Sequence, residues 1–109
     1  MENTRRRKQP PLPSSVRVGG RRYSIDVIET MLSRGEMARI EYENGKIRIG
    51  KRSNVTGKPY SSAQLSESFF HELVHAILYD MNEHKLNKNE AFVTEFAKRL
   101  SKAIRSRRF

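Results

Sequence analysis

The residues best suited to chemistry are His71, Glu72 and His75, which form the pattern HExxH within an apolar run. Residues four apart lie on one face of an α-helix, so both imidazoles can reach the same ion. Zinc is often held by imidazole, and it lowers the pKa of a bound water from about 15.7 to about 7. Glu72 would accept a proton from that water and pass it to a leaving amine. The pattern predicts a zinc-dependent hydrolase, with two surface histidines on a helix as the alternative.

A catalytic zinc site needs a third protein ligand. The chain contains no cysteine, so this ligand must be histidine or a carboxylate. The longer pattern HExxHxxGxxH would need Gly at position 78 and His at position 81, where the chain has Leu78 and Met81. Three candidates remain downstream, namely His84, Glu90 and Glu95.

Helical phase separates the two glutamates. Residues 89–105 are expected to form a helix whose apolar side chains face inward, namely Phe92, Val93, Phe96, Leu100 and Ile104. Glu90 lies roughly 90° from the centre of this stripe and Glu95 roughly 130° from it. Glu95 also shares its face with lysines and arginines, which predicts ion pairs along the helix. Glu90 is therefore the predicted third ligand, and His84 is expected in a solvated loop.

Two hairpins are predicted before the helix that carries HExxH. Residues 16–18 and 22–28 flank Gly19-Gly20, and residues 37–42 and 46–49 flank Asn44-Gly45, a dipeptide that favours a type I′ turn. The result is an α+β fold with four short antiparallel strands. Because hydrophobic and basic residues alternate in 46–49, this segment is expected to be a half-buried edge strand.

The helix that carries HExxH is expected over residues 63–81, with Ser61 or Ser62 as its N-cap. Stepping 100° per residue gives one apolar stripe, formed by Phe70, Leu73, Val74, Ile77 and Met81. The two histidines fall to one side of this stripe. They are therefore expected to face a cleft while the stripe packs in the core, and residues 80–88 are expected to be a polar connection.

Charge is concentrated at the two ends of this 109-residue chain, whose net charge is +10. Residues 1–22 and 98–109 each carry +6, which leaves −2 for residues 23–97. Residues 1–15 also contain Pro10, Pro11 and Pro13 and are expected to form a flexible arm. Such basic ends are expected to bind nucleic acid or an acidic protein, with a solubilising tail as the alternative.

Localisation is constrained by what the sequence lacks. No apolar run approaches the roughly 20 residues of a membrane span, and the basic start is not followed by the apolar stretch of a secretion signal. The absence of cysteine fits a reducing compartment. A soluble cytoplasmic protein of one small domain, with no membrane contact, is the expectation.

Two segments carry a resemblance to a known family. Residues 69–79 (FFHELVHAILY) and 89–97 (NEAFVTEFA) resemble the gluzincin metallopeptidases, in which a Glu on a downstream helix completes HExxH. More narrowly, residues 16–100 resemble compact phage and mobile-element members related to the ImmA/IrrE peptidases. The resemblance implies a zincin-like domain over residues 16–109, located in the host cytoplasm if phage-encoded. It also implies that His71, His75 and Glu90 bind Zn²⁺. Glu72 would be the general base in the hydrolysis of a protein or peptide substrate.

The resemblance has further implications. Residues 46–49 would form the upper rim of the cleft and receive an extended peptide by β-addition. Many gluzincins have an acidic residue four positions after the ligand Glu, where this chain has Thr94. A threonine cannot tune histidine basicity as a carboxylate would, which predicts weaker metal binding or slower turnover.

Stabilisation of the oxyanion is left open between Tyr79, Tyr60 and His84, each of which could donate a hydrogen bond. A second function class also stays open. The chain could be a non-catalytic binding or assembly protein on a zincin scaffold that acts through its basic arms. A combination of the two, a peptidase delivered to nucleic acid by its arms, is the third hypothesis.

Overall fold

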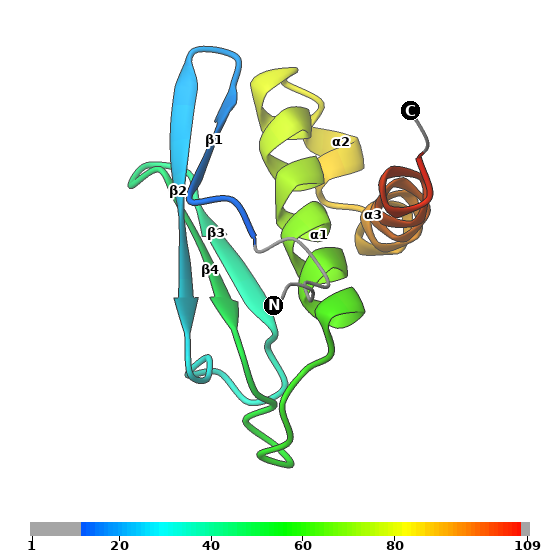
Figure 1. Cartoon of the computed structure of the whole chain (residues 1–109). Helices are drawn as coiled ribbons and strands as arrows, with labels where there is room; N and C mark the ends of the chain where they lie inside the picture. Colours follow the sequence, from blue (N-terminus) through cyan, green and yellow to red (C-terminus); the bar gives the residue numbers. More distant parts are fainter. Residues whose placement is uncertain (1–11, 108–109) are drawn as a thin grey trace, which may run out of the picture.

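The computed structural model describes residues 12–107 and has the predicted α+β fold. Within these residues, the strands of one four-stranded sheet are β1 (Ser15–Val18), β2 (Arg21–Ile28), β3 (Ala38–Glu41) and β4 (Lys46–Gly50). The helices are α1 (Ser62–Asp80), α2 (His84–Asn87) and α3 (Glu90–Arg105). Figure 1 shows α1 against one face of the sheet and α3 on the far side of α1. The helix that carries HExxH is therefore the middle of three layers.

Both predicted hairpins are present, but the way in which the two hairpins pair within the sheet differs from the prediction. β1 pairs antiparallel with β2, and β3 pairs antiparallel with β4. The strand order is β1-β2-β4-β3, and β2 runs parallel to β4. The prediction of four antiparallel strands is therefore wrong at this pair. The prediction that residues 46–49 form an edge strand is also wrong, because β4 lies between two partners. The edges of the sheet are β1 and β3.

The central position of β4 agrees with the burial of its side chains. Ile47 and Ile49 are fully buried and pack with Tyr23 of β2 and Phe69 of α1. Lys46 and Arg48 alternate with them and point to the face without helices. One face of the sheet thus builds the main core against α1.

The start of the fold lies earlier than the sequence predicted. Of the arm expected over residues 1–15, residues 1–11 lie outside the described part of the chain. Leu12 packs against the main core, and the carbonyl of Ser14 accepts a hydrogen bond of 2.9 Å from the N–H of Ile25. Ser15 begins β1. Residues 12–15 are therefore part of the domain.

The N-terminus of α1 is fixed by a capping box, as its serines led us to expect. The Ser61 hydroxyl accepts a hydrogen bond of 3.1 Å from the N–H of Gln64, and the Gln64 side chain accepts one of 2.8 Å from the N–H of Ser61. These bonds satisfy two backbone donors that a helix end leaves unpaired. The start of α1, and with it the direction of the HExxH side chains, is thereby defined.

α1 buries two faces rather than one stripe. Phe69 and Ala76 face the sheet core, while Val74 and Leu78 pack on α3. The predicted single stripe is wrong at its end, because Ile77 and Met81 are exposed. A helix covered on two sides has a wider buried surface than one stripe provides. Among residues 12–107, no helix is long and apolar enough to cross a membrane.

α3 begins where Asn89 caps it by accepting a hydrogen bond of 3.1 Å from the N–H of Phe92. Its buried side chains are small or β-branched, namely Val93, Ala97 and Ser101. The predicted inward positions of Phe96 and Ile104 are wrong, since both side chains are exposed. Small residues let α3 approach α1 closely, which moves the larger apolar residues to the flank. α2, a single helical turn, lies in the segment that was expected to be only a polar connection.

Candidate metal centre

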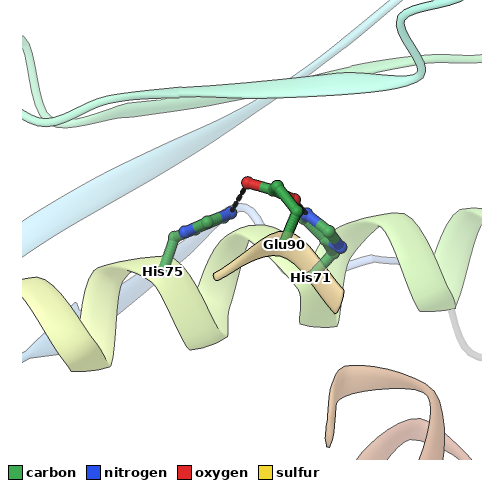
Figure 2. Close-up of side chains that lie close together, drawn as sticks. All are labelled: His71, His75 and Glu90. Carbon is green, nitrogen blue, oxygen red and sulfur yellow. Dashed lines mark hydrogen bonds and ion pairs between the residues drawn. The ribbon is translucent and has the colours of Figure 1, made fainter. Parts of the chain in front are cut away.

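Three side chains from two helices converge on one point. His71 and His75 project from α1, and the Glu90 carboxylate from the first turn of α3 lies between their imidazoles (Figure 2). Nε2 of His71 lies 3.1 Å from Oε1 of Glu90, and Nε2 of His75 lies 3.1 Å from Oε2. The structure therefore brings together the three residues that the sequence predicted as ligands.

The spacing of these atoms fits a metal ion. One ligand atom from each residue lies within 4.8 Å of the others. A tetrahedral zinc site with bonds of about 2.0–2.1 Å separates neighbouring ligand atoms by about 3.3 Å. The observed separations of 3.1 Å between Nε2 atoms and carboxylate oxygens are close to this value. Two imidazoles and one carboxylate are also a donor set of catalytic zinc sites. The group could therefore hold a metal ion.

Local structure explains the convergence. The four-residue spacing on α1 places the two imidazole rings 5.0 Å apart. Contacts of Val74 with α3 hold the two helices together. The Asn89 cap fixes the residue at which α3 begins, so that Glu90 occupies its first turn. Helix packing and capping together aim the carboxylate at the histidines.

His75 has a second partner that the sequence did not indicate. Its Nδ1 lies 2.6 Å from Oδ1 of Asn87 in α2, and Nδ2 of Asn87 donates a hydrogen bond of 3.2 Å to the hydroxyl of Tyr42. An amide oxygen only accepts, so Nδ1 of His75 carries a proton and Nε2 is the nitrogen that faces Glu90 and can bind a metal ion. Asn87 thus selects the tautomer of His75 that can bind a metal. No sequence pattern marks Asn87, because one helical turn is too short to show periodicity.

We expect Asn87→Ala to weaken metal binding at this centre about 10- to 100-fold, with zinc as the metal tested, because His75 would lose the partner that fixes its orientation and tautomer. Competition with a chromophoric chelator measures this affinity. Lys85→Ala is the matched control, since Lys85 lies on the same turn, is exposed and makes no contact with the centre. Equal zinc affinities of the two variants would show that Asn87 has no positioning role.

Glu72 is buried next to the centre, with only 7% of its surface exposed. Burial raises the pKa of Glu72 to about 8, and the carboxylates of Glu90 and Glu36 add to the effect. Within residues 12–107, no cation pairs with this carboxyl. An ionised group is costly to bury without a counter-charge, so a nearby bound cation would stabilise it. Burial also lowers the pKa of His71, with His75 contributing, which favours the neutral imidazole that binds metals.

A cleft of about 480 Å³ opens beside Glu72 and His71. Its walls come from three elements: Met37 and Ala38 at the start of β3, the N-terminal half of α1, and Thr94 on α3. Thr94 lines the cleft, but in the described part of the chain it forms no hydrogen bond with either histidine. The amide of Asn87 contacts His75 instead. The cleft gives an extended ligand a route to Glu72.

The other candidate ligands lie elsewhere. Glu95 forms ion pairs with Lys98, at 3.8 Å, and with Arg99, so the predicted ion pairing is confirmed. His84 is exposed at the first position of α2. Neither residue belongs to the group of three that could hold a metal. Helical phase therefore distinguished the two glutamates correctly.

The three candidates for the oxyanion donor are not brought to the cleft. The ring of Tyr79 stacks on Tyr42 with their centroids 4.1 Å apart, and the guanidinium of Arg21 lies over it. Tyr60 precedes α1, where its N–H donates to the carbonyl of Lys51. Neither tyrosine, nor His84, is among the residues that line the cleft next to Glu72. Tyr79 therefore has a packing role in this structure.

The candidate metal centre is identified by its geometry and not by a resemblance to other proteins. Its donor atoms, their spacing and the adjacent buried carboxyl follow from the contacts above, whereas the resemblance of residues 69–79 and 89–97 to gluzincins stays a prediction. Compared with known protein families, with curated proteins and with solved structures, the chain matches none of them.

Proposed function

We propose that this chain is a zinc-dependent endopeptidase whose ion is held by His71, His75 and Glu90. The observation that carries the proposal is the set of three donor atoms at ligand spacing, next to a buried glutamate that opens onto a cleft. Zinc, when bound, would polarise the peptide carbonyl and activate a water molecule. The two imidazoles and the carboxylate of Glu90 would hold the ion, and of these three residues His71 also lines the cleft.

Glu72 would act as the general base. It follows His71 directly on α1 and lines the cleft, so its carboxylate can reach a water positioned there. It would accept a proton from that water and deliver it to the nitrogen of the leaving amine. Only 7% of the surface of Glu72 is exposed, which limits the access of bulk water to this transfer.

The substrate would bind along β3 rather than along residues 46–49. β3 is an edge strand, and the N–H of Gly50 donates to the carbonyl of Met37 at 3.0 Å. Backbone groups alternate in direction along a strand, so those of Ala38 and Ile40 point to the open edge. An extended peptide could pair with these groups and pass over the cleft, whose wall includes Ala38.

The second candidate is a non-catalytic binding or assembly protein that uses the same scaffold. It is favoured by one observation: none of Tyr60, Tyr79 and His84, the candidate oxyanion donors, lines the cleft beside Glu72. Here the metal would be structural, and the basic ends of the chain would bind nucleic acid or an acidic protein. The two candidates share the metal centre and differ in turnover.

Digestion of a broad peptide library by the zinc-loaded protein, with products identified by mass spectrometry, distinguishes them. The endopeptidase should give a defined set of internal cleavages that a chelator abolishes and added zinc restores. Protein that binds one zinc ion per chain but leaves the whole library intact would contradict the endopeptidase and favour the second candidate. Cleavage that persists after complete zinc removal would exclude a catalytic role for zinc. It would also exclude the second candidate, because the chain would then be an enzyme.

A further inference from the structure

The sheet has a charged face that no helix covers. We call it the outer face, and in Figure 1 all described helices lie on the opposite side of the sheet. Strand register assigns to it the charged side chains that alternate with the core residues. They are Arg17, Arg22, Asp26, Arg39, Glu41, Lys46 and Arg48. With five basic and two acidic residues, the outer face is positively charged.

Register places like charges directly opposite each other at two points on this face. Arg17 of β1 pairs with Arg22 of β2, and Arg39 of β3 pairs with Arg48 of β4. Like charges at directly opposed positions of neighbouring strands destabilise a sheet. The two arginine pairs are thus unfavourable for folding and would become favourable with an anion bound between or above them.

The two arginine pairs differ in whether nearby carboxylates compensate their positive charge. Nε of Arg39 lies 2.9 Å from Glu36, and Nε of Arg48 lies 3.2 Å from Glu41. Arg17 and Arg22 are both exposed, and no carboxylate in the described part of the chain pairs with either. The uncompensated charge of the outer face is therefore at the β1-β2 end. The ion pairs at the other end are partly exposed and contribute little stability, so phosphates can replace the carboxylates.

We propose that the outer face binds duplex nucleic acid through its phosphates. Asp26 is in register with Arg48, and Arg22 lies four residues before Asp26. At about 3.3 Å per residue, the two arginine pairs are about 13 Å apart along the strands, and two strand spacings of about 4.8 Å separate them across the sheet, so their centres are about 16 Å apart. The pairs can therefore contact separate phosphates of one duplex, whose charges recur about every 1.7 Å along its axis.

The composition of the outer face favours a duplex as its ligand over a single strand or an acidic protein. Single strands are bound largely by stacking of bases on aromatic side chains, and this face offers none among residues 12–107. An acidic protein would usually bury apolar side chains as well, and Ile28 is the one apolar side chain that register assigns to this face. A rigid array of guanidinium groups suits a rigid array of phosphates.

The metal centre lies on the opposite side of the sheet, so the two sites are independent. Glu72 and His75 project from α1, which packs on the inner face of the sheet. Duplex on the outer face would leave the cleft open. Binding can therefore be measured with zinc present or absent, and its failure would not affect the proposed peptidase.

The test compares Arg17→Gln/Arg22→Gln with Lys85→Gln/Lys88→Gln, which removes the same charge from exposed positions at α2, outside the outer face and both basic ends. A labelled duplex of about two helical turns is titrated with the full chain by fluorescence anisotropy at several salt concentrations. Two lost phosphate contacts should reduce the slope of log K against log[salt] by about 1.8 and weaken binding about thirtyfold at about 0.15 M salt. The α2 variant should change binding by less than about threefold.

Several results would overturn the proposal. Equal losses in the two variants would mean that net charge alone drives binding, and tighter binding of a single strand of the same length would exclude a duplex site. Competition by polyglutamate as effective as that by duplex would assign the face to an acidic protein. Thermal melting is the check on folding, and the outer-face variant should melt no lower than the parent because it removes an arginine pair. A lower melting temperature would refute the claim that this pair is unfavourable.

Discussion

Glu72→Gln is expected to abolish peptide cleavage while leaving one zinc ion bound per chain. The amide has nearly the shape of the carboxyl but cannot accept a proton, so the loss should be at least the 10²- to 10⁴-fold that general acid–base catalysis contributes. Zinc should stay bound, because Glu72 is not among the three residues that could hold the ion. Rates on a peptide from the library digestion, together with metal analysis of the same sample, measure both properties.

The control for this prediction is Glu67→Gln. Glu67 lies five residues earlier on α1 and lines the same cleft, so it tests whether any carboxylate in the cleft would serve. Cleavage by this variant should change only a few-fold. If Glu72→Gln still cleaves at a rate close to that of the parent protein, Glu72 is not the base. Loss of zinc from Glu72→Gln would instead show that this side chain takes part in holding the ion.

The group of three residues that could hold a metal ion was predictable from the sequence because its geometry is local. His71 and His75 lie on one helix, so their relative position follows from the pitch of that helix. Glu90 lies on another helix, but the Asn89 cap and the apolar stripe of α3 set its phase. Only the packing of two neighbouring helices had to be assumed.

Long-range features could not be predicted in the same way. The alternation in residues 46–49 is the same for an edge strand and for a central strand covered on one face, so it could not place β4 beside β2. Asn87 contacts His75 only because the one-turn helix α2 brings it back to α1. The exposure of Phe96 results from Ala97 and Ser101, whose small side chains set the closest approach to α1. Each feature depends on a contact between segments that lie far apart in the sequence.

The second large effect is expected for Glu90→Ala, which should lose zinc during dialysis that leaves the parent protein loaded. Two imidazoles would remain, and the ion would lose the only carboxylate of the three-residue group. We expect zinc affinity to fall more than about 100-fold, beyond the effect of removing an outer partner such as Asn87. Metal analysis after dialysis gives the stoichiometry, and chelator competition gives the affinity.

Glu95→Ala is the matched control, because Glu95 lies on the same helix but pairs with Lys98 and Arg99. It should keep one zinc ion per chain. Both substitutions remove one negative charge from α3, so a difference between them cannot come from net charge. Glu90 also interacts with the helix dipole in the first turn of α3, which contributes about 0.3–1 kcal/mol. Without metal, Glu90→Ala also loses the contacts of Glu90 with His71 and His75, and Glu95→Ala loses two ion pairs, so each variant is compared with itself: zinc should raise the melting temperature of Glu95→Ala and not that of Glu90→Ala. Stoichiometric zinc in Glu90→Ala would remove Glu90 from the site.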